Sequence, residues 1–408
     1  MPSRRNARGI LTAILSSVGL IGPGVAAAQS TVSWINPAGG QWSAPSNWSA
    51  GTAPGPEDHA VFDLGSPGGY TVSFSANVSS RSLSLLGDRV TFDLAGNTYA
   101  VMNSGSLTAV HAGSSAGPTE WTLRGGGALS TGSLGAARIA QQPYASVILN
   151  VEQATTLQTD SLFVGSGSSV ARININGGQL LSRYGNVRVL EGSTINYNSG
   201  VFSVGTLDLD KGHIALGSGG DKVVHAFGVL GRGVIDLNDN AMVRSFNNGG
   251  GWLEMMLYSG YNAGRWDGPG IRSSAAAANP RMALGYGDGW DLAISSFLGY
   301  PLNYNSTLVR YTYYGDANLD GVVNIRDLRA LAKNWKRPYS RWVGGDFNYD
   351  DQTDALDLKL LAMNWSGGIA SLNEALASLE LPQVSVPEPG VAAVLILAAT
   401  LRSRQRNR

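Results

Sequence analysis

Acidic and amide side chains recur at fixed spacing near the C-terminal end of the chain. A twelve-residue calcium loop draws oxygen ligands from positions 1, 3, 5, 7, 9 and 12 and turns sharply at position 6. In residues 316–327 the ligand positions hold Asp316, Asn318, Asp320, the Val322 carbonyl, Asn324 and Asp327. Gly321 occupies position 6. Oxygen donors without nitrogen or sulfur suit a hard cation, so this segment predicts a calcium site.

The same pattern returns 30 residues later in the chain. The ligand positions of residues 346–357 hold Asp346, Asn348, Asp350, the Gln352 carbonyl, Asp354 and Asp357. Position 6 is Asp351 in place of glycine. Because Asp tolerates a left-handed backbone better than most residues, we expect a second Ca²⁺ to bind here, more weakly than the first.

Each loop leads into a segment with helical periodicity, residues 328–335 and 358–365, whose Leu and Trp positions share one face. A loop followed by a helix, without a helix before it, resembles the duplicated calcium module of type I dockerins, over residues 315–367. The resemblance implies a small α-helical domain over residues 313–368 that binds two Ca²⁺ ions. It also implies a cohesin-like protein as partner.

In that family, partner choice depends on positions 10 and 11 of each loop. These positions hold Ile325 and Arg326 in the first loop and Ala355 and Leu356 in the second. They differ from the usual Ser-Thr pair, so docking within the same chain is the alternative to a cohesin-like partner.

The N-terminus has the three parts of a secretory signal peptide over residues 1–28. Arg4, Arg5 and Arg8 precede an apolar run at 10–21, and small residues at 26–28 form the cleavage site. We therefore expect an exported protein, extracellular or at the cell surface. Charged residues are only 14% of the chain and its formal net charge is zero, so no nucleic-acid partner is expected. The absence of cysteine excludes disulfides and thiolate metal sites.

The C-terminus carries a second signal. Pro387, Glu388 and Pro389 precede an apolar run at 390–401 and four arginines. The arrangement resembles the PEP-CTERM sorting signal, which implies recognition and removal by a membrane protease. The apolar run has 12 residues, whereas a membrane-spanning helix needs about 20. We therefore expect only transient membrane association through residues 387–408.

Between the two signals, short runs alternate apolar with small polar residues and are separated by Gly-rich turns. The runs recur every ~20 residues from 70 to 214, which indicates a repeat architecture. Asn176, Gly177 and Gly178 resemble the corner of a β-helix rung. The expected fold is mainly β: a right-handed parallel β-helix, or solenoid, with the small C-terminal α-helical domain. A β-sandwich is the rival.

Trp34, Trp42 and Trp48 lie among Gly, Pro and Ser near the start of the expected solenoid. This pattern resembles the start of surface β-helix proteins of the autotransporter-repeat kind and implies a cap; a sugar-stacking platform is the alternative. The expected organisation is a signal peptide at 1–28, the solenoid with its cap at 29–255, a junction at 256–312, the calcium module at 313–368, a linker at 369–386 and the sorting signal at 387–408. Within the junction, a short Ala-rich helix is expected near residues 274–278.

No catalytic site is assigned from the sequence. Asp208 and Asp210 share one face of a strand, which could serve a polysaccharide hydrolase or lyase, but a solvated strand end explains them as well. The expected function is that of a non-enzymatic surface or matrix protein, structural or adhesive. The alternative is a secreted polysaccharide-active or carbohydrate-binding protein that uses the solenoid face, with an extracellular polysaccharide as partner.

Overall fold

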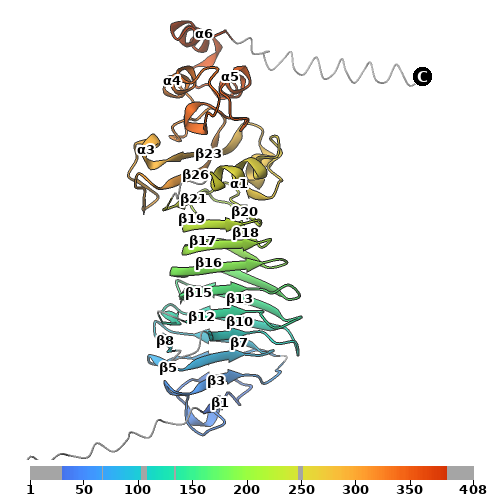
Figure 1. The fold of residues 1–408 in the computed structure, drawn as a ribbon. Coiled ribbons are helices and arrows are strands. Elements are labelled where there is room, and N and C mark those ends of the chain that lie inside the picture. The colour runs from blue at the N-terminus through green and yellow to red at the C-terminus, as the bar shows by residue number, and fades with distance from the viewer. Residues whose placement is uncertain (1–29, 67, 103–107, 133–134, 247–250, 384–408) are drawn as a thin grey trace, which may run out of the picture.

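The computed structural model describes residues 30–66, 68–102, 108–132, 135–246 and 251–383. The expected signal peptide at 1–28 and the expected sorting signal at 387–408 lie outside these residues. The chain forms a long stack of strands with helices at its C-terminal end (Figure 1). Among the described residues, none of the helices has the length and apolar character needed to cross a bilayer.

The fold is mainly β, as expected, and nearly all of its strands belong to one large, mainly parallel sheet. Three columns of parallel strands build its N-terminal half. The first column contains β1 (Thr31–Ser33), β3 (His59–Phe62), β6 (Ser82–Leu85), β9 (Thr108–Ala112), β12 (Ala136–Ile139) and β15 (Ser161–Val164). The second contains β2 (Gly40–Gln41), β4 (Tyr70–Ser73), β7 (Arg89–Asp93), β10 (Thr119–Arg124) and β13 (Ser146–Glu152). The third contains β5 (Val78–Ser80), β8 (Thr98–Val101), β11 (Ala128–Ser130) and β14 (Thr156–Gln158).

Two long strands then continue all three columns. They are β16 (Val170–Leu190) and β17 (Thr194–Asp210). Shorter strands complete the parallel stack: β18 (His213–Leu216), β19 (Val223–Gly231), β20 (Val234–Asp236), β21 (Ala241–Arg244) and β22 (Gly270–Arg272). Parallel pairing of this extent excludes the rival sandwich, whose sheets would be antiparallel.

Apolar residues in register form a continuous core along the stack. Trp121 pairs with Val90 on one side and Leu149 on the other, and Leu149 pairs with Ile173. All four are buried. The stack repeats every 31 residues between Val90 and Trp121 but every 22 between Ile173 and Ile195. The expected period of ~20 therefore fits the later coils and the early pairing of Tyr70 with Val90, while longer turns lengthen some of the coils between them.

Asparagines on the surface of the stack also align from coil to coil. Asn174 Nδ2 donates to Asn150 Oδ1 at 2.8 Å, and Asn196 Nδ2 donates to Asn174 Oδ1 at 2.7 Å. Each side-chain amide therefore forms a hydrogen bond with the amide of the next coil, which keeps the coils in register.

The N-terminal tryptophans close one end of the core. Trp34, Trp42 and Trp48 are each at most 2% exposed. Trp48 packs edge-on against both other indoles and donates its Nε1 hydrogen to the Trp42 carbonyl at 2.6 Å. The short 3₁₀ helix η1 (Pro45–Asn47) lies directly before Trp48. The burial of these residues agrees with the expected cap, and it leaves none of their ring faces exposed for stacking on a sugar.

The C-terminal cap combines short helices with antiparallel strands. It comprises α1 (Trp252–Tyr261), α2 (Ser274–Ala278), β23 (Met282–Asp288), α3 (Gly289–Leu292), β24 (Ser296–Phe297), β25 (Tyr300–Pro301) and β26 (Thr307–Tyr313). β26 pairs antiparallel with both β21 and β23. The Ala-rich helix is where the sequence predicts it. The boundary at 255 does not match a structural break, because α1 crosses it and β22, further along the chain, pairs in parallel with β20.

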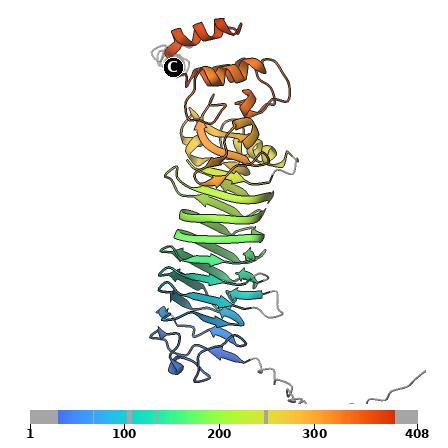
Figure 2. The ribbon, with the colours of Figure 1, turned by 90° about the vertical axis from the view of Figure 1, so that its left-hand side faces the viewer.

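Three helices lie beyond the cap at the same end of the molecule (Figure 2). They are α4 (Ile325–Lys333), α5 (Ala355–Ala362) and α6 (Gly368–Ser378), with the 3₁₀ helix η2 (Trp342–Gly344) between the first two. The linker expected at 369–386 is instead helical at its start, and Leu372 and Leu376 of α6 are buried.

Four half-buried histidines on the stack connect its stability to pH. Burial lowers their pKa below the ordinary 6.5; they are His59, His111, His213 and His225. Below pH 6.5 the unfolded chain takes up protons that the folded chain resists, so this contribution to stability is complete above that pH and is lost as the pH falls through it.

We expect His225→Gln to reduce the fall in melting temperature between about pH 7.5 and about pH 5.5. In the folded chain, His225 Nδ1 lies 2.8 Å from Ser203 Oγ and Nε2 lies 2.7 Å from Ser245 Oγ. Glutamine can both donate and accept but does not titrate. Thermal unfolding of both proteins, in saturating calcium to hold other titrations constant, measures the difference. Parallel pH profiles would contradict this prediction.

Candidate metal centre

The two acidic loops, loop 1 (residues 316–327) and loop 2 (residues 346–357), have matching hydrogen bonds at position 1. Asp316 Oδ1 accepts from the Asp320 N–H at 3.1 Å, and Asp346 Oδ1 accepts from the Asp350 N–H at 3.2 Å. The second oxygen of each accepts from the N–H at position 6, at 2.9 Å and 3.0 Å. Position 1 therefore folds each loop back on itself in the same way.

The carboxylate at position 12 closes each loop. Asp327 Oδ1 accepts from the N–H groups at positions 2 and 3, at 2.9 Å and 3.2 Å, and Asp357 Oδ1 does the same at 2.8 Å and 3.1 Å. Their Oδ2 atoms accept from the N–H of the helix N-cap, Asn324 or Asp354, at 2.9 Å. Asn324 with Asp327, and Asp354 with Asp357, form a capping box at the start of α4 and α5. The capping box explains why a helix begins there.

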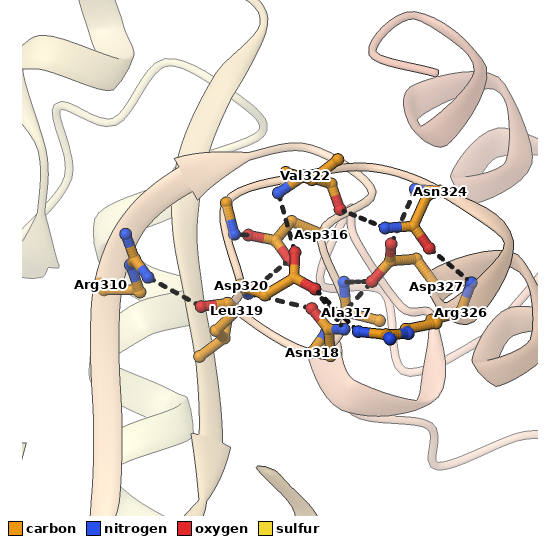
Figure 3. A network of polar contacts seen from close by, with 11 residues as sticks. Arg310, Asp316, Ala317, Asn318, Leu319, Asp320, Val322, Asn324, Arg326 and Asp327 are labelled. Atoms are coloured by element: carbon orange, nitrogen blue, oxygen red, sulfur yellow. Dashed lines mark hydrogen bonds and ion pairs between the residues drawn. The ribbon is translucent and has the colours of Figure 1, made fainter. Parts of the chain in front are cut away.

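The side chains at positions 3 and 5 lie close together in loop 1 (Figure 3), and the same contact recurs in loop 2. Asn318 Nδ2 donates to Asp320 Oδ2 at 2.9 Å, and Asn348 Nδ2 donates to Asp350 Oδ2 at the same distance. At position 6, Gly321 has φ +89° and Asp351 has φ +64°. Asp351 therefore adopts the left-handed turn that aspartate tolerates.

Negative charge is concentrated and buried in both loops. The carboxylates at positions 1 and 12 are at most 4% exposed: Asp316, Asp327, Asp346 and Asp357. Burial raises the pKa of all four, to about 6 for Asp327 and Asp357 and about 8 for Asp346. Within the described residues, Arg326 forms an ion pair with a loop carboxylate, that of the exposed Asp320, at 3.9 Å. The buried carboxylates have no ion-pair partner of their own there.

The donor chemistry of both loops fits a hard cation. An ionised carboxylate offers about four lone-pair sites, so hydrogen bonds to the loop backbone leave acceptor capacity free. In the part of the chain that the structure describes, no three Asp, Glu, His or Cys side chains are grouped closely enough to hold a metal unaided. The candidate sets also draw on amide oxygens at position 3 and carbonyls at position 7. A bound calcium ion would neutralise the buried charge.

No protein-family model, curated protein or solved structure matches this chain. What the loops can do therefore follows from their donor atoms and from the groups packed around them.

Two glycines that sequence reasoning missed join the loops to the opposite helices. Gly315 and Gly345 precede position 1 of loops 1 and 2, with φ +95° and +100°. An added Cβ at Gly315 would lie 2.6 Å from Leu361 Cα in α5, and one at Gly345 would lie 2.7 Å from Leu331 Cα in α4. Each loop thus rests against the helix that follows the other loop. The signal in the sequence was a glycine directly before each repeat.

Gly345→Ala is expected to destabilise the paired loops by about 2 kcal/mol or more, because the added methyl meets backbone atoms and the positive φ disfavours alanine. Urea denaturation followed by helical circular dichroism measures the change. Gly321→Ala is the control, because Gly321 also has a positive φ but an added Cβ there would have nothing within 4 Å. It measures the cost of the backbone conformation without the cost of close packing. Equal losses from the two variants would contradict the close packing.

Position 4 of each loop attaches the loops to the cap, which the sequence also did not indicate. Leu319 and Tyr349 are 4% and 6% exposed, and both have left-handed backbones. The Tyr349 hydroxyl donates to the Leu284 carbonyl in β23. A Cβ at Gly285 would lie 2.5 Å from Leu319 Cδ2, so a glycine in β23 makes room for loop 1.

Two residues between the loops extend this attachment. Trp342 is fully buried and donates its Nε1 hydrogen to the Asp316 carbonyl at 2.7 Å. The Arg341 guanidinium pairs with Glu254 of α1 at 3.0 Å and with Asp288 of β23 at 2.9 Å. Polar and apolar contacts therefore join both loops to the end of the strand stack.

The acidic pair on the stack, Asp208 and Asp210, does not belong to this centre. Arg188 lies 3.4 Å from Asp208 and 3.0 Å from Asp210, and all three side chains are partly solvent-exposed. This arrangement agrees with a solvated strand surface, the other explanation of these residues. The four histidines lie on the stack as well, in β3, β9, β18 and β19.

Proposed function

We propose that this chain is an exported structural or adhesive protein of the cell surface or extracellular matrix. Its strand stack would be a right-handed parallel β-helix, and its C-terminal helices a dockerin-like module that binds two Ca²⁺ ions. In-register parallel pairing, a continuous apolar core and side-chain ladders support the β-helix assignment. A long rigid body with ordered surface faces suits a scaffold or an adhesin.

The observation that carries the calcium proposal is the match between the two loops. Residues 30 positions apart make the same hydrogen bonds at positions 1, 3 and 12. Both loops bury two carboxylates. A buried carboxylate is costly unless a cation or hydrogen bonds compensate it, and calcium is the hard divalent cation that accepts such a flexible set of oxygen donors.

The packing favours docking within the chain over a cohesin-like partner as the main role of the module. Position 4 of both loops and the intervening Trp342 are buried at the cap, so the cap already occupies one face of the module. Arg326, Ala355 and Leu356 at the family's partner-recognition positions remain exposed, which leaves a second face for a protein.

Isothermal titration of residues 29–386 with calcium tests the proposal directly. We expect two bound ions per chain, one in Asp316→Ala, and none in Asp316→Ala combined with Asp346→Ala. Asp208→Ala, which removes an acidic residue from the stack, should leave two. Titration heats that are absent in the parent chain, or unchanged in the double variant, would overturn the assignment.

A further inference from the structure

Helix α1 presents a row of large side chains to solvent. Trp252, Met255 and Tyr258 are three residues apart and therefore share a face; they are 37%, 61% and 64% exposed. The opposite face is firmly packed, because Leu253 and Leu257 are buried and a Cβ at position 260 would lie 1.9 Å from the Ile271 carbonyl oxygen. We call the exposed row the α1 strip.

The α1 strip lies between two cavities that share Met255 and Ser259. One cavity, of about 280 Å³, lies between Trp252 and the segments containing Arg232 and Pro269. The other, of about 410 Å³, lies between Tyr258 and the edge of loop 2, and includes Glu254 and Asp351. The helix is at the side of the cap, next to the last parallel strands (Figure 1). A ligand that crosses the strip can therefore enter both cavities.

The polar groups in these cavities carry opposite charges. Arg232 offers hydrogen-bond donors on the Trp252 side, while the exposed Asp351 offers acceptors on the Tyr258 side. Two further carboxylates line that side: Glu254, which also pairs with Arg341, and Asp346, the buried residue at position 1 of loop 2. Asp351 and Arg232 are both exposed. The carboxylates would repel an anionic ligand, and Arg232 would repel a cationic one. A purely apolar segment would remove water from these charged groups without replacing their hydrogen bonds.

A neutral saccharide matches this mixture. Its hydroxyl groups both donate and accept, so they can satisfy the guanidinium and the carboxylates, and its C–H faces can pack on the Trp252 and Tyr258 rings. Along the helix the two rings are separated by six residues, or about 9 Å of rise, which allows one chain of linked sugar rings to contact both.

We propose that the α1 strip is a binding site for neutral polysaccharide chains. The site is distinct from the stack surface and from the N-terminal tryptophans, and it does not require calcium. It would give the surface protein a contact to an extracellular glycan at the end of the molecule that also carries the acidic loops.

Affinity electrophoresis of residues 29–386 through gels containing laminarin, hydroxyethylcellulose or dextran tests the proposal, with alginate as the anionic probe. We expect at least one neutral polymer to retard the protein, with and without calcium, and alginate not to do so. Trp252→Ala and Tyr258→Ala should each weaken the retardation at least about tenfold, as loss of a central aromatic anchor does. Trp290→Ala is the matched control, because Trp290 is 76% exposed on α3, outside the strip.

Each other result overturns the proposal. The overturning results are that none of the neutral polymers retards the protein, that alginate retards it equally, or that Trp290→Ala weakens the retardation as much as Trp252→Ala. Sedimentation velocity on the same samples tests a second copy of the chain as occupant: a dimer that Trp252→Ala dissociates would replace the saccharide. Calcium titration of the same variants separates this outcome from failure of the metal proposal, since all three should still bind two ions.

Discussion

Saturating calcium is expected to stabilise the C-terminal part of the chain by about 5 kcal/mol, since each site contributes about 2.7 kcal/mol at a hundredfold excess over its dissociation constant. Asp327→Asn combined with Asp357→Asn should abolish most of this gain. Both carboxylates are buried and close their loops through backbone N–H groups. The amide oxygen of asparagine can still accept the hydrogen bonds that Oδ1 accepts, but its NH2 group cannot accept the N-cap N–H that Oδ2 accepts. The side chain also lacks the charge that a divalent cation requires.

The same double variant should behave differently without calcium. In a chelator, the parent chain buries two desolvated carboxylates that its described cationic side chains do not pair. Their replacement removes the cost of burying two charges, which offsets the loss of one N-cap hydrogen bond in each loop. The variant is therefore expected to be about as stable as the parent. A purely structural role for these residues would make the variant less stable in both conditions.

Urea denaturation at fixed calcium and in chelator measures all four stabilities. Asp208→Asn with Asp210→Asn is the matched control, because it removes two acidic residues from the stack surface and should preserve the calcium gain. If the gain survives in the Asp327 and Asp357 variant, the ligand assignment is wrong.

Trp342→Ala is expected to cost about 3–5 kcal/mol, the range for removing a large aromatic side chain from a core. The indole is fully buried, and the ring centroids of Phe347 and Tyr349 lie 5.1 Å and 5.8 Å from its own. The substitution leaves a cavity and also removes the donor to the Asp316 carbonyl. Unsatisfied buried acceptors add to the loss.

Because Trp342 joins loop 1 to the cap, its removal should also loosen the cap itself. We expect faster amide hydrogen exchange in β23 and β26 of the variant, with exchange in β13 and β16 unchanged. Trp290→Ala, at an exposed site on the same cap, should alter neither stability nor exchange measurably. Unchanged exchange in β23 despite a large loss of stability would argue against attachment of the loops to the cap.

Much of the acidic centre could be predicted from sequence because its donors are local. Twelve consecutive residues contain the whole candidate ligand set of each loop, so spacing alone identifies Asp316 or Asp357. The left-handed turn at Asp351 follows from the same local argument. Strands were predictable for a similar reason, since alternation along a run such as Val147 to Val151 already separates the buried side chains from the exposed ones.

What could not be predicted depends on partners distant in sequence. Leu319 and Tyr349 resemble ordinary loop residues until β23 is placed beside them. Gly345 appears to be a flexible turn residue until α4 lies against it. The number of residues in each coil was equally inaccessible, because turns between strands can lengthen without changing the register of the strands that pair.

The antiparallel pairing of β26 with β21 has a consequence for how the molecule behaves at high concentration. A stack of parallel strands ends in a row of free N–H and C=O groups, which is a template for another chain. Here β26 pairs with β21, α1 packs against β22, and indoles close the opposite end of the core. We therefore expect the cap to oppose end-to-end joining of chains, whereas a chain without it would present a strand edge able to extend into fibres.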